Sequence, residues 1–226
     1  MSEPLISLLH PTVRPKAWKV TANNWLQSCD HPENVEYVLV PERVQFPNLN
    51  DLKTPFERQV IAYNENRAST VGGSNYAAQV SHGKILFVIA DDFYSAPHWD
   101  TDLLRLLNGK LDQEAVVWAS TGISNFDENF ISLPILTRPY YQRLGNYVFW
   151  PEYTSYYADV EFHEVAKLNK VEMIDARNIL KFSHIRGGID GSYPFHTDEH
   201  YIKNGGPEGV ACGTLFGKRQ AAGFPR

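Results

Sequence analysis

Short apolar runs alternate with segments of helical periodicity along the first 120 residues of the chain. The apolar runs are rich in Val, Ile and Leu and lead into polar or turn-forming residues, which predicts strands at residues 4–9, 35–40, 58–64, 84–90 and 115–120. Between them, apolar residues three or four apart predict helices at residues 16–28, 72–83 and 99–110. Such alternation is typical of an open α/β sheet, mostly parallel, with helices on both faces. Ligands bind such sheets at the carboxyl ends of the strands.

The second half of the chain is less regular. Residues 122–157 are loop-rich and aromatic, and we expect them either to cover a binding cleft or to fill the core. Helical periodicity returns at residues 158–170, and a further strand is expected near residues 171–180. The last forty or so residues are rich in Gly, His and Pro, which predicts a segment that wraps the surface.

Composition restricts the possible classes of protein. The 226 residues carry 21 basic and 26 acidic side chains, a net charge of -5, which argues against a general nucleic-acid binder. Cys29 and Cys212 have neither disulfide-framework nor zinc-finger spacing. The first residues lack the features of a secretory signal, and no apolar run approaches the ~18 residues of a membrane span. We therefore expect one cytoplasmic globular domain without an integral membrane segment.

Candidate chemistry is concentrated after the fourth predicted strand, where Asp91 and Asp92 are adjacent. The chain has neither the GxxxxGK[ST] spacing of a P-loop nor a GxGxxG after its first strand. A nucleoside triphosphatase and a Rossmann dehydrogenase are therefore poorly supported.

Four segments together resemble one enzyme family. SLLHPTVRP is similar to its opening strand and loop, YVLVPE to its second strand ending in an acid, and NRASTVGGSNYAA to its Gly-containing helix entry; KILFVIADDFYSAPHW is similar to its metal-site strand. The family is the inverting family 2 of nucleotide-sugar glycosyltransferases. The resemblance of this chain to that family implies a GT-A fold, a Rossmann-like sandwich with a mostly parallel central sheet. It covers residues 4–110 and continues more weakly to 184, which implies a nucleotide-binding half (1–110), an acceptor-side half (111–185) and a C-terminal wrap (186–226).

The resemblance also implies roles for residues of the donor site. Glu42 corresponds to the acid that contacts the nucleotide base, Asp91 to a residue near the ribose, and Asp92 to a ligand of Mn²⁺ or Mg²⁺ on the donor diphosphate. The family's usual DxD has a further aspartate where this chain has Ala90. Nucleotide-contacting candidates nearby are Thr12, Arg14 and Arg67, the last being equally interpretable as a surface arginine.

Other candidates lie later in the chain. Asp159 in YYADVEF matches the family's catalytic base, or caps a helix, and Glu161 is the second candidate base or an ion-paired helix residue. His184 matches a late histidine of the cation site, or is a hydrogen-bonded structural residue. Gly187 and Gly188 suggest a loop that closes over the diphosphate. A second polar cluster could be metal-like but is better interpreted as a polar tail: His196, Asp198 and His200. Four aromatic residues could form either a sugar-stacking platform or a core cluster: Trp150, Tyr153, Tyr156 and Tyr157.

The resulting hypothesis is transfer of a sugar from a UDP- or GDP-linked donor to a carbohydrate or other hydroxyl acceptor. Two alternatives stay open at this point. One is a non-catalytic carbohydrate- or nucleotide-binding protein on the same fold, and the other is a nucleotidyltransferase, although HPTVRP lacks that class's glycine-rich loop.

Overall fold

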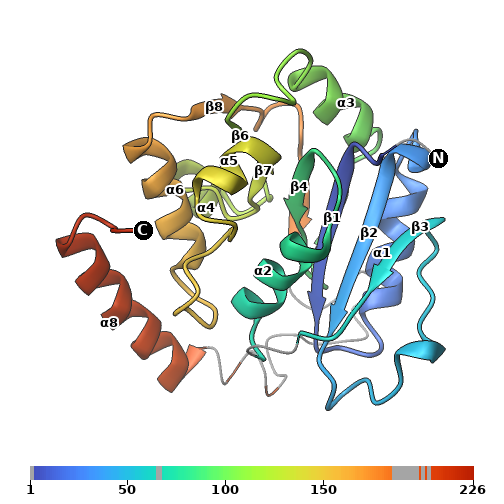
Figure 1. The fold of residues 1–226 in the computed structure, drawn as a ribbon, viewed down its shortest axis with the longest axis horizontal. Coiled ribbons are helices and arrows are strands. Elements are labelled where there is room, and N and C mark those ends of the chain that lie inside the picture. Colours follow the sequence, from blue (N-terminus) through green and yellow to red (C-terminus); the bar gives the residue numbers. More distant parts are fainter. Residues whose placement is uncertain (1–2, 65–67, 185–198, 200–201, 203–204) are drawn as a thin grey trace.

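The computed structural model describes residues 3–64, 68–184, 199, 202 and 205–226, and its centre is a seven-stranded sheet (Figure 1). The strand order is β3-β2-β1-β4-β7-β6-β8. The bounds are Arg58–Ile61 (β3), Val35–Pro41 (β2), Ile6–Thr12 (β1), Ile85–Val88 (β4), Ile135–Thr137 (β7), Ala115–Trp118 (β6) and Glu172–Asp175 (β8). Only β7 runs antiparallel to its neighbours, β4 and β6. The predicted mostly parallel sheet and its strands are confirmed.

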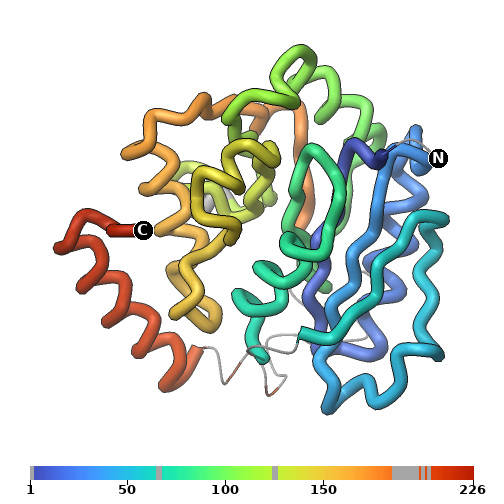
Figure 2. The backbone as a smooth tube through the Cα atoms, in the orientation of Figure 1, coloured from blue at the N-terminus to red at the C-terminus, as the bar shows by residue number. Residues whose placement is uncertain are grey.

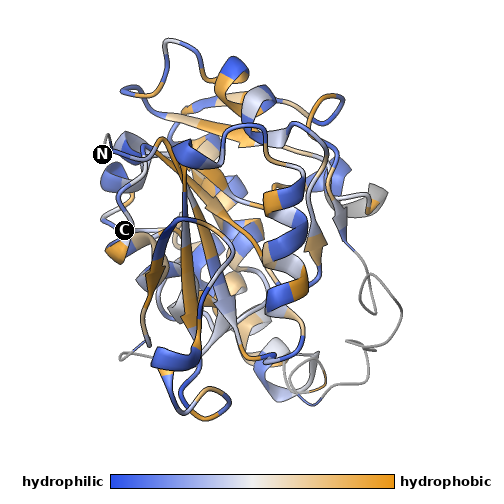
Figure 3. Ribbon diagram, turned by 90° about the vertical axis from the view of Figure 1, so that its right-hand side faces the viewer, coloured by the Kyte–Doolittle hydropathy of each residue, from blue (hydrophilic) through white to orange (hydrophobic). Residues whose placement is uncertain are grey.

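The central strands are apolar because both faces of the sheet are covered. Successive side chains point to opposite faces, so Leu8 and Phe87 belong to one core cluster while Leu9 and Val88 belong to the other. Figure 3 shows these hydrophobic strands enclosed between helices. The sheet therefore separates two cores, each closed by its own set of helices.

Helices flank the sheet on both sides. The first core is closed by α1 (Trp18–Gln27) and α3 (Trp99–Leu106), and the second by α2 (Thr70–Val80), α5 (Arg138–Arg143) and α6 (Ala158–Leu168). The predicted helices at 16–28, 72–83, 99–110 and 158–170 are thus confirmed, with α2 beginning two residues early because Ser69 caps it by accepting from the Gly72 N–H. Within the described ranges, no helix is both long and apolar enough to cross a membrane.

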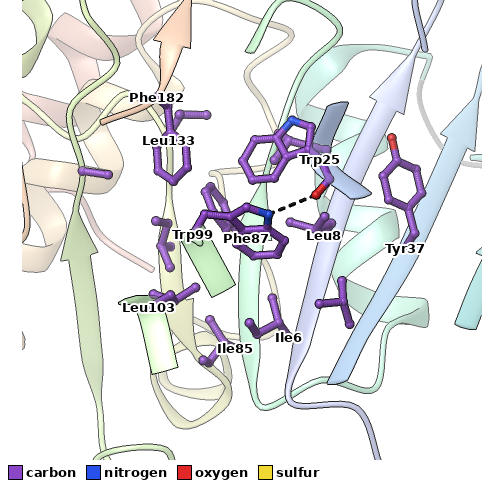
Figure 4. Packing of buried hydrophobic residues seen from close by; sticks show 14 of the residues in the cluster. Ile6, Leu8, Trp25, Tyr37, Ile85, Phe87, Trp99, Leu103, Leu133 and Phe182 are labelled. Carbon is purple, nitrogen blue, oxygen red and sulfur yellow. Dashed lines mark hydrogen bonds between the residues drawn. The ribbon is translucent and has the colours of Figure 1, made fainter. Parts of the chain in front are cut away.

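Aromatic rings fill the first core. The Trp25 ring lies edge-on to Phe87 and Trp99, with centroid separations of 5.1 and 5.2 Å, and stacks on Phe182 (Figure 4). The Trp99 indole donates to the Trp25 carbonyl over 3.1 Å. This contact fastens α3 to α1 and satisfies a polar group that would otherwise be buried unpaired.

Residues 122–157 differ from the loop-rich prediction. They contain α4 (Ser124–Asn129), the central strand β7 and α5. Pro134 and Pro139 flank β7 so closely that only three residues pair, too few for a recognisable strand pattern. Tyr140 and Tyr153 are fully buried, so much of the aromatic content belongs to the second core and does not cover a cleft.

The C-terminal segment holds a helix that the sequence does not predict, α8 (Pro207–Ala221), which packs beside α6. The chain then turns back toward α6 (Figure 2), where Phe224 is buried. Arg219 of α8 makes a bidentate ion pair with Glu161 of α6, with both N–O distances 2.8 Å. The Tyr153 hydroxyl donates to the same carboxylate over 2.9 Å. The side chains of Arg219 and Glu161 are 8% and 1% exposed, so this is a buried ion pair at the α6–α8 contact.

Removing one partner of this pair should leave an uncompensated buried charge. We expect Arg219→Ala to lower the free energy of unfolding by roughly 3 kcal/mol, whereas Lys218→Ala, at an exposed neighbouring position, changes it by less than about 0.5 kcal/mol. Urea unfolding followed by circular dichroism measures both. Equal stability of the two variants would mean that the ion pair does not hold α8.

Candidate functional site

The carboxyl ends of β1, β2 and β4 meet at one hollow of about 460 Å³. The three strands end at the same edge of the sheet because they are paired in parallel, with Leu9 opposite Val88 and Thr12 opposite Pro41. The residues that follow each strand therefore lie close together. The Glu42 N–H donates to the Thr12 carbonyl over 3.0 Å and continues that pairing past the strand end. Four of the predicted nucleotide-site residues line this hollow: Thr12, Arg14, Glu42 and Asp91.

Asp91 is held almost entirely by protein groups. Its side chain is 2% exposed, and each carboxylate oxygen lies 2.9 Å from the Thr12 hydroxyl. Arg14 Nη1 lies 3.4 Å from Oδ2, and His10 Nε2 lies 3.0 Å from Oδ1. A buried carboxylate needs such partners. Asp91 therefore orients the loop that follows β1.

His10 is a part of this site that the sequence analysis did not single out. It is fully buried in β1, and its Nδ1 is hydrogen-bonded to the Tyr37 hydroxyl. Burial, together with the nearby Asp91 charge, holds the pKa of Tyr37 well above its ordinary value, so the hydroxyl keeps its proton and donates it to Nδ1. Nε2 can then donate to Asp91. The signal in the sequence was a histidine that directly follows the apolar run of residues 4–9.

Asp92 points away from this network and meets His184. Asp92 Oδ2 lies 3.0 Å from His184 Nε2, and both side chains keep some exposure, 18% and 15%. The contact depends on a two-stranded antiparallel sheet, β5 (Phe93–Tyr94) with β9 (Ser183–His184), in which Phe93 lies opposite His184. The two rings pack with centroids 4.6 Å apart. The fold thus brings together two candidate residues that are 92 positions apart in the sequence.

The Asp92–His184 pair fits two ligands of a divalent cation. A carboxylate oxygen and an imidazole nitrogen are donors that such cations accept, and the two atoms are already adjacent. His184 Nδ1 is buried without a hydrogen-bond partner among the described atoms. No described group of three or more His, Cys, Asp and Glu side chains is arranged as a metal site. Further ligands would have to come from a bound molecule or water.

Asp159 lies in the first turn of α6, beside a second hollow of about 630 Å³. The helix is entered through Tyr157, whose φ of 67° is unusual for a bulky residue and is a form of backbone strain seen at functional sites. The Asp159 carboxylate accepts from the Val160 N–H over 2.9 Å. Desolvation outweighs this contact and raises the pKa of Asp159 to about 6. Asp159 can therefore bind and release a proton near neutral pH.

Among the remaining candidates, Glu161 and the aromatic residues near it have structural contacts. Glu161 is the ion-paired helix residue of the two interpretations, because Arg219 and Tyr153 occupy its carboxylate. The prediction that four aromatic residues form one sugar-stacking platform is wrong, because Tyr153 is buried in the core while Tyr156 and Tyr157 are 39% and 41% exposed. The Arg219 guanidinium covers the Trp150 ring at 3.5 Å. Six candidates lie outside the described residues: Arg67, Gly187, Gly188, His196, Asp198 and His200.

No protein-family model and no curated protein matches this sequence, but its fold is similar to solved structures. The crystal structure of S. aureus TarS 1–349 matches with a TM-score of 0.60 and 14% identity, over 80% of this chain and 60% of that one. Its complex with UDP-GlcNAc gives 0.59 and 14%, over 79% and 58%. The mannosyltransferase PcManGT from Pyrobaculum calidifontis, in complex with GDP-Man and Mn²⁺, gives 0.57 and 13%, over 80% and 57%.

These likenesses show the fold. The chain has the GT-A fold that the sequence motifs predict, with the mixed α/β sandwich and seven-stranded sheet described above. It spans 57% to 60% of the length of these three structures.

The raised pKa of Asp159 has a consequence for stability. Above its unfolded pKa near 4, the folded protein must hold a carboxylate that its surroundings disfavour, and this cost grows until about pH 6 and then stays constant. We expect Asp159→Asn, which is neutral and of the same shape, to raise the free energy of unfolding by about 1 to 2 kcal/mol at pH 7. The gain should vanish at pH 4. Urea unfolding at both pH values tests this, and a gain that is the same at both would contradict it.

Proposed function

We propose that this protein is a divalent-cation-dependent glycosyltransferase that moves a sugar from a nucleoside-diphosphate donor to an acceptor hydroxyl, with inversion at the anomeric carbon. One observation carries the proposal. The hollow at the strand ends shares Thr70 and Ala90 with the hollow that contains Asp159. A carboxylate with a pKa of about 6 therefore faces the space next to the end of β4, beside the Asp91–Asp92 turn.

The donor nucleotide would occupy the hollow at the ends of β1, β2 and β4. Glu42 at its β2 side is suited to accept hydrogen bonds from a base, and Thr12 and Arg14 from the β1 side are suited to ribose or phosphate oxygens. Asp91 would act as the group that fixes this loop, and Arg67 as a further phosphate ligand. Bound UDP-GlcNAc and GDP-Man in proteins of similar fold support a UDP- or GDP-linked donor.

Asp92 and His184 would hold the cation, Mn²⁺ or Mg²⁺, next to the donor. When bound, it would supply positive charge against the diphosphate oxygens as the leaving group departs. Mn²⁺ in the mannosyltransferase of similar fold supports this assignment. For the chain itself, the role of the β5–β9 pairing is to keep the Asp92 oxygen and the His184 nitrogen adjacent.

Asp159 would be the base. The acceptor hydroxyl would lose its proton to the Asp159 carboxylate while its oxygen forms the bond to the anomeric carbon. In the same step the bond from that carbon to the diphosphate oxygen breaks, and its electron pair leaves with the diphosphate. A single displacement of this kind inverts the anomeric centre. Glu161 takes no part because its carboxylate is occupied by Arg219.

One observation favours a second candidate, a non-catalytic nucleotide-binding protein on the same fold. The chain has Ala90 where an additional carboxylate would strengthen the cation site, and only two described protein ligands are present. The two candidates differ in a single measurement. The enzyme releases free sugar or glycoside from a nucleotide sugar when the cation is present, whereas the binding protein retains its ligand unchanged.

The cation assignment is tested by calorimetric titration of UDP and GDP with and without Mn²⁺. We expect binding of one nucleotide to strengthen at least tenfold with Mn²⁺, and Asp92→Asn to abolish that gain because the carboxylate ligand is lost. Asp112→Asn is the matched control, since Asp112 is exposed and contacts only the Lys84 side chain among the described groups. Undiminished Mn²⁺ dependence in Asp92→Asn would contradict the assignment.

The base assignment is tested by the pH dependence of kcat/KM. Only the ionised Asp159 can accept a proton, so kcat/KM should be level above about pH 6 and fall tenfold per pH unit below it. Asp159→Asn should lower kcat by roughly 10²- to 10⁴-fold and leave nucleotide affinity unchanged. Glu164→Gln, on the same helix, should keep the wild-type profile. An acid limb that persists in Asp159→Asn would assign the proton transfer to another group.

A further inference from the structure

A third hollow of about 980 Å³ lies between the start of α6 and the helix α8. We call it the α6–α8 groove, defined by Tyr156, Tyr157 and Val160 on one side and by Gly209 and Val210 of α8 on the other. The groove is open to solvent, with Val210 71% exposed. Most of its described lining residues are apolar or aromatic, and it adjoins the site described above.

The groove adjoins the hollow of the proposed base. Tyr156 and Asp159 line both, and that hollow in turn shares Thr70 and Ala90 with the strand-end hollow. The three spaces therefore follow one another from the strand ends, past Asp159, to α8. Because Asp159 lines the groove, a molecule bound there can present a hydroxyl to its carboxylate.

The side chains that line the groove restrict the kind of molecule that can bind in it. Phe130, Tyr156 and Tyr157 supply aromatic rings, and Asp159 is the one charged side chain among the described lining residues, which include no lysine or arginine. The hollow on the other side of Thr70 differs, because Arg14, Glu42, Glu199 and Glu208 line it. The aromatic space therefore favours an uncharged occupant with a flat apolar face, and the Asp159 carboxylate would repel an anion.

Glycines of α8 give the groove its width. Gly209 and Gly213 are one helical turn apart and both line it. A Cβ added at Gly213 would lie 3.2 Å from Tyr157 Cε2, so that ring already packs against the helix backbone. Tyr157 also stacks on Phe216, with centroids 5.3 Å apart. A larger side chain at position 209 would take up part of the open space.

We propose that the α6–α8 groove binds the acceptor, and that the acceptor is neutral and carries an aryl or similarly flat apolar group close to the reacting hydroxyl. The proposal rests on the proposed glycosyl transfer and adds the class of acceptor. The apolar group lies against Tyr156, Tyr157 and the glycine face of α8, while its hydroxyl reaches Asp159. Phosphate-bearing acceptors find no cation in the described lining to receive them.

Direct binding tests the proposal with phenyl β-glucoside as the neutral aryl probe, and glucose and glucose 6-phosphate as comparisons. We expect the aryl glycoside to bind at least tenfold more tightly than either comparison. Gly209→Leu should weaken its binding at least tenfold, whereas Gly217→Leu should not change it. The two substitutions are matched, since both glycines lie in α8 and a Cβ at Gly217 meets nothing within 4 Å.

A gain of function provides the second test. Val210→Arg adds a cation at an exposed position of the groove, and we expect it to raise affinity for glucose 6-phosphate several-fold. Ala211→Arg, at an exposed position of α8 that does not line the groove, is the control and should have no effect.

The outcomes separate this proposal from the proposed function. Equal aryl glycoside affinity in Gly209→Leu and wild type, or tighter wild-type binding of glucose 6-phosphate than of the aryl glycoside, overturns the acceptor assignment. Titration of UDP and GDP with Mn²⁺ into the same variants reports the donor site independently. Absence of nucleotide binding in all of them would refute the proposed transfer, even if the groove bound the aryl probe as expected.

Discussion

The requirement that a buried carboxylate be fully hydrogen-bonded determines how the functional end of the sheet is assembled. Asp91, at the end of β4, receives the Thr12 hydroxyl, His10 from within β1, and the more distant Arg14 guanidinium. Its backbone carbonyl accepts from the Thr21 hydroxyl of α1 over 2.7 Å. One residue thus joins two strands and a helix, and fixes the direction in which its neighbour Asp92 leaves the sheet. The cation pair with His184 depends on that direction.

The division of polar and apolar surface around this end follows from the sheet topology. The parallel strands β1, β2 and β4 release their carboxyl ends into one polar hollow, as open α/β sheets generally do. The antiparallel β7 leads directly into α5, which brings aromatic side chains under α6 on the other side of β4. Asp159 lies where the two environments meet. Its desolvation, and therefore its capacity to exchange a proton near neutral pH, is a product of that position.

The helix α8 is joined to the site through α6. Glu161, which is two residues after Asp159, forms a buried ion pair with Arg219 of α8. Two residues before Asp159, the Tyr157 ring packs against Phe216 and the α8 backbone. A buried ion pair of this kind contributes little net stability, because desolvation offsets most of the attraction, but it requires one alignment of the two helices. The same alignment brings Gly209 and Gly213 of α8 to the side of the groove that faces Tyr157.

Local sequence patterns were enough to predict the strands and helices of the first 120 residues, because strands covered on both faces must be apolar throughout and the apolar positions of amphipathic helices must recur every three or four residues. It also indicated Asp91, Asp92, Asp159 and His184, since the motifs that contain them are local. Features that depend on contacts between distant segments became visible only in the folded chain. The central position of β7 requires β4 and β6 beside it, and His10 acquires its role from Tyr37 and Asp91. Glu161 meets Arg219 across 58 positions, and the pKa of Asp159 rises because packed neighbours exclude water, which no spacing of residues along the chain records.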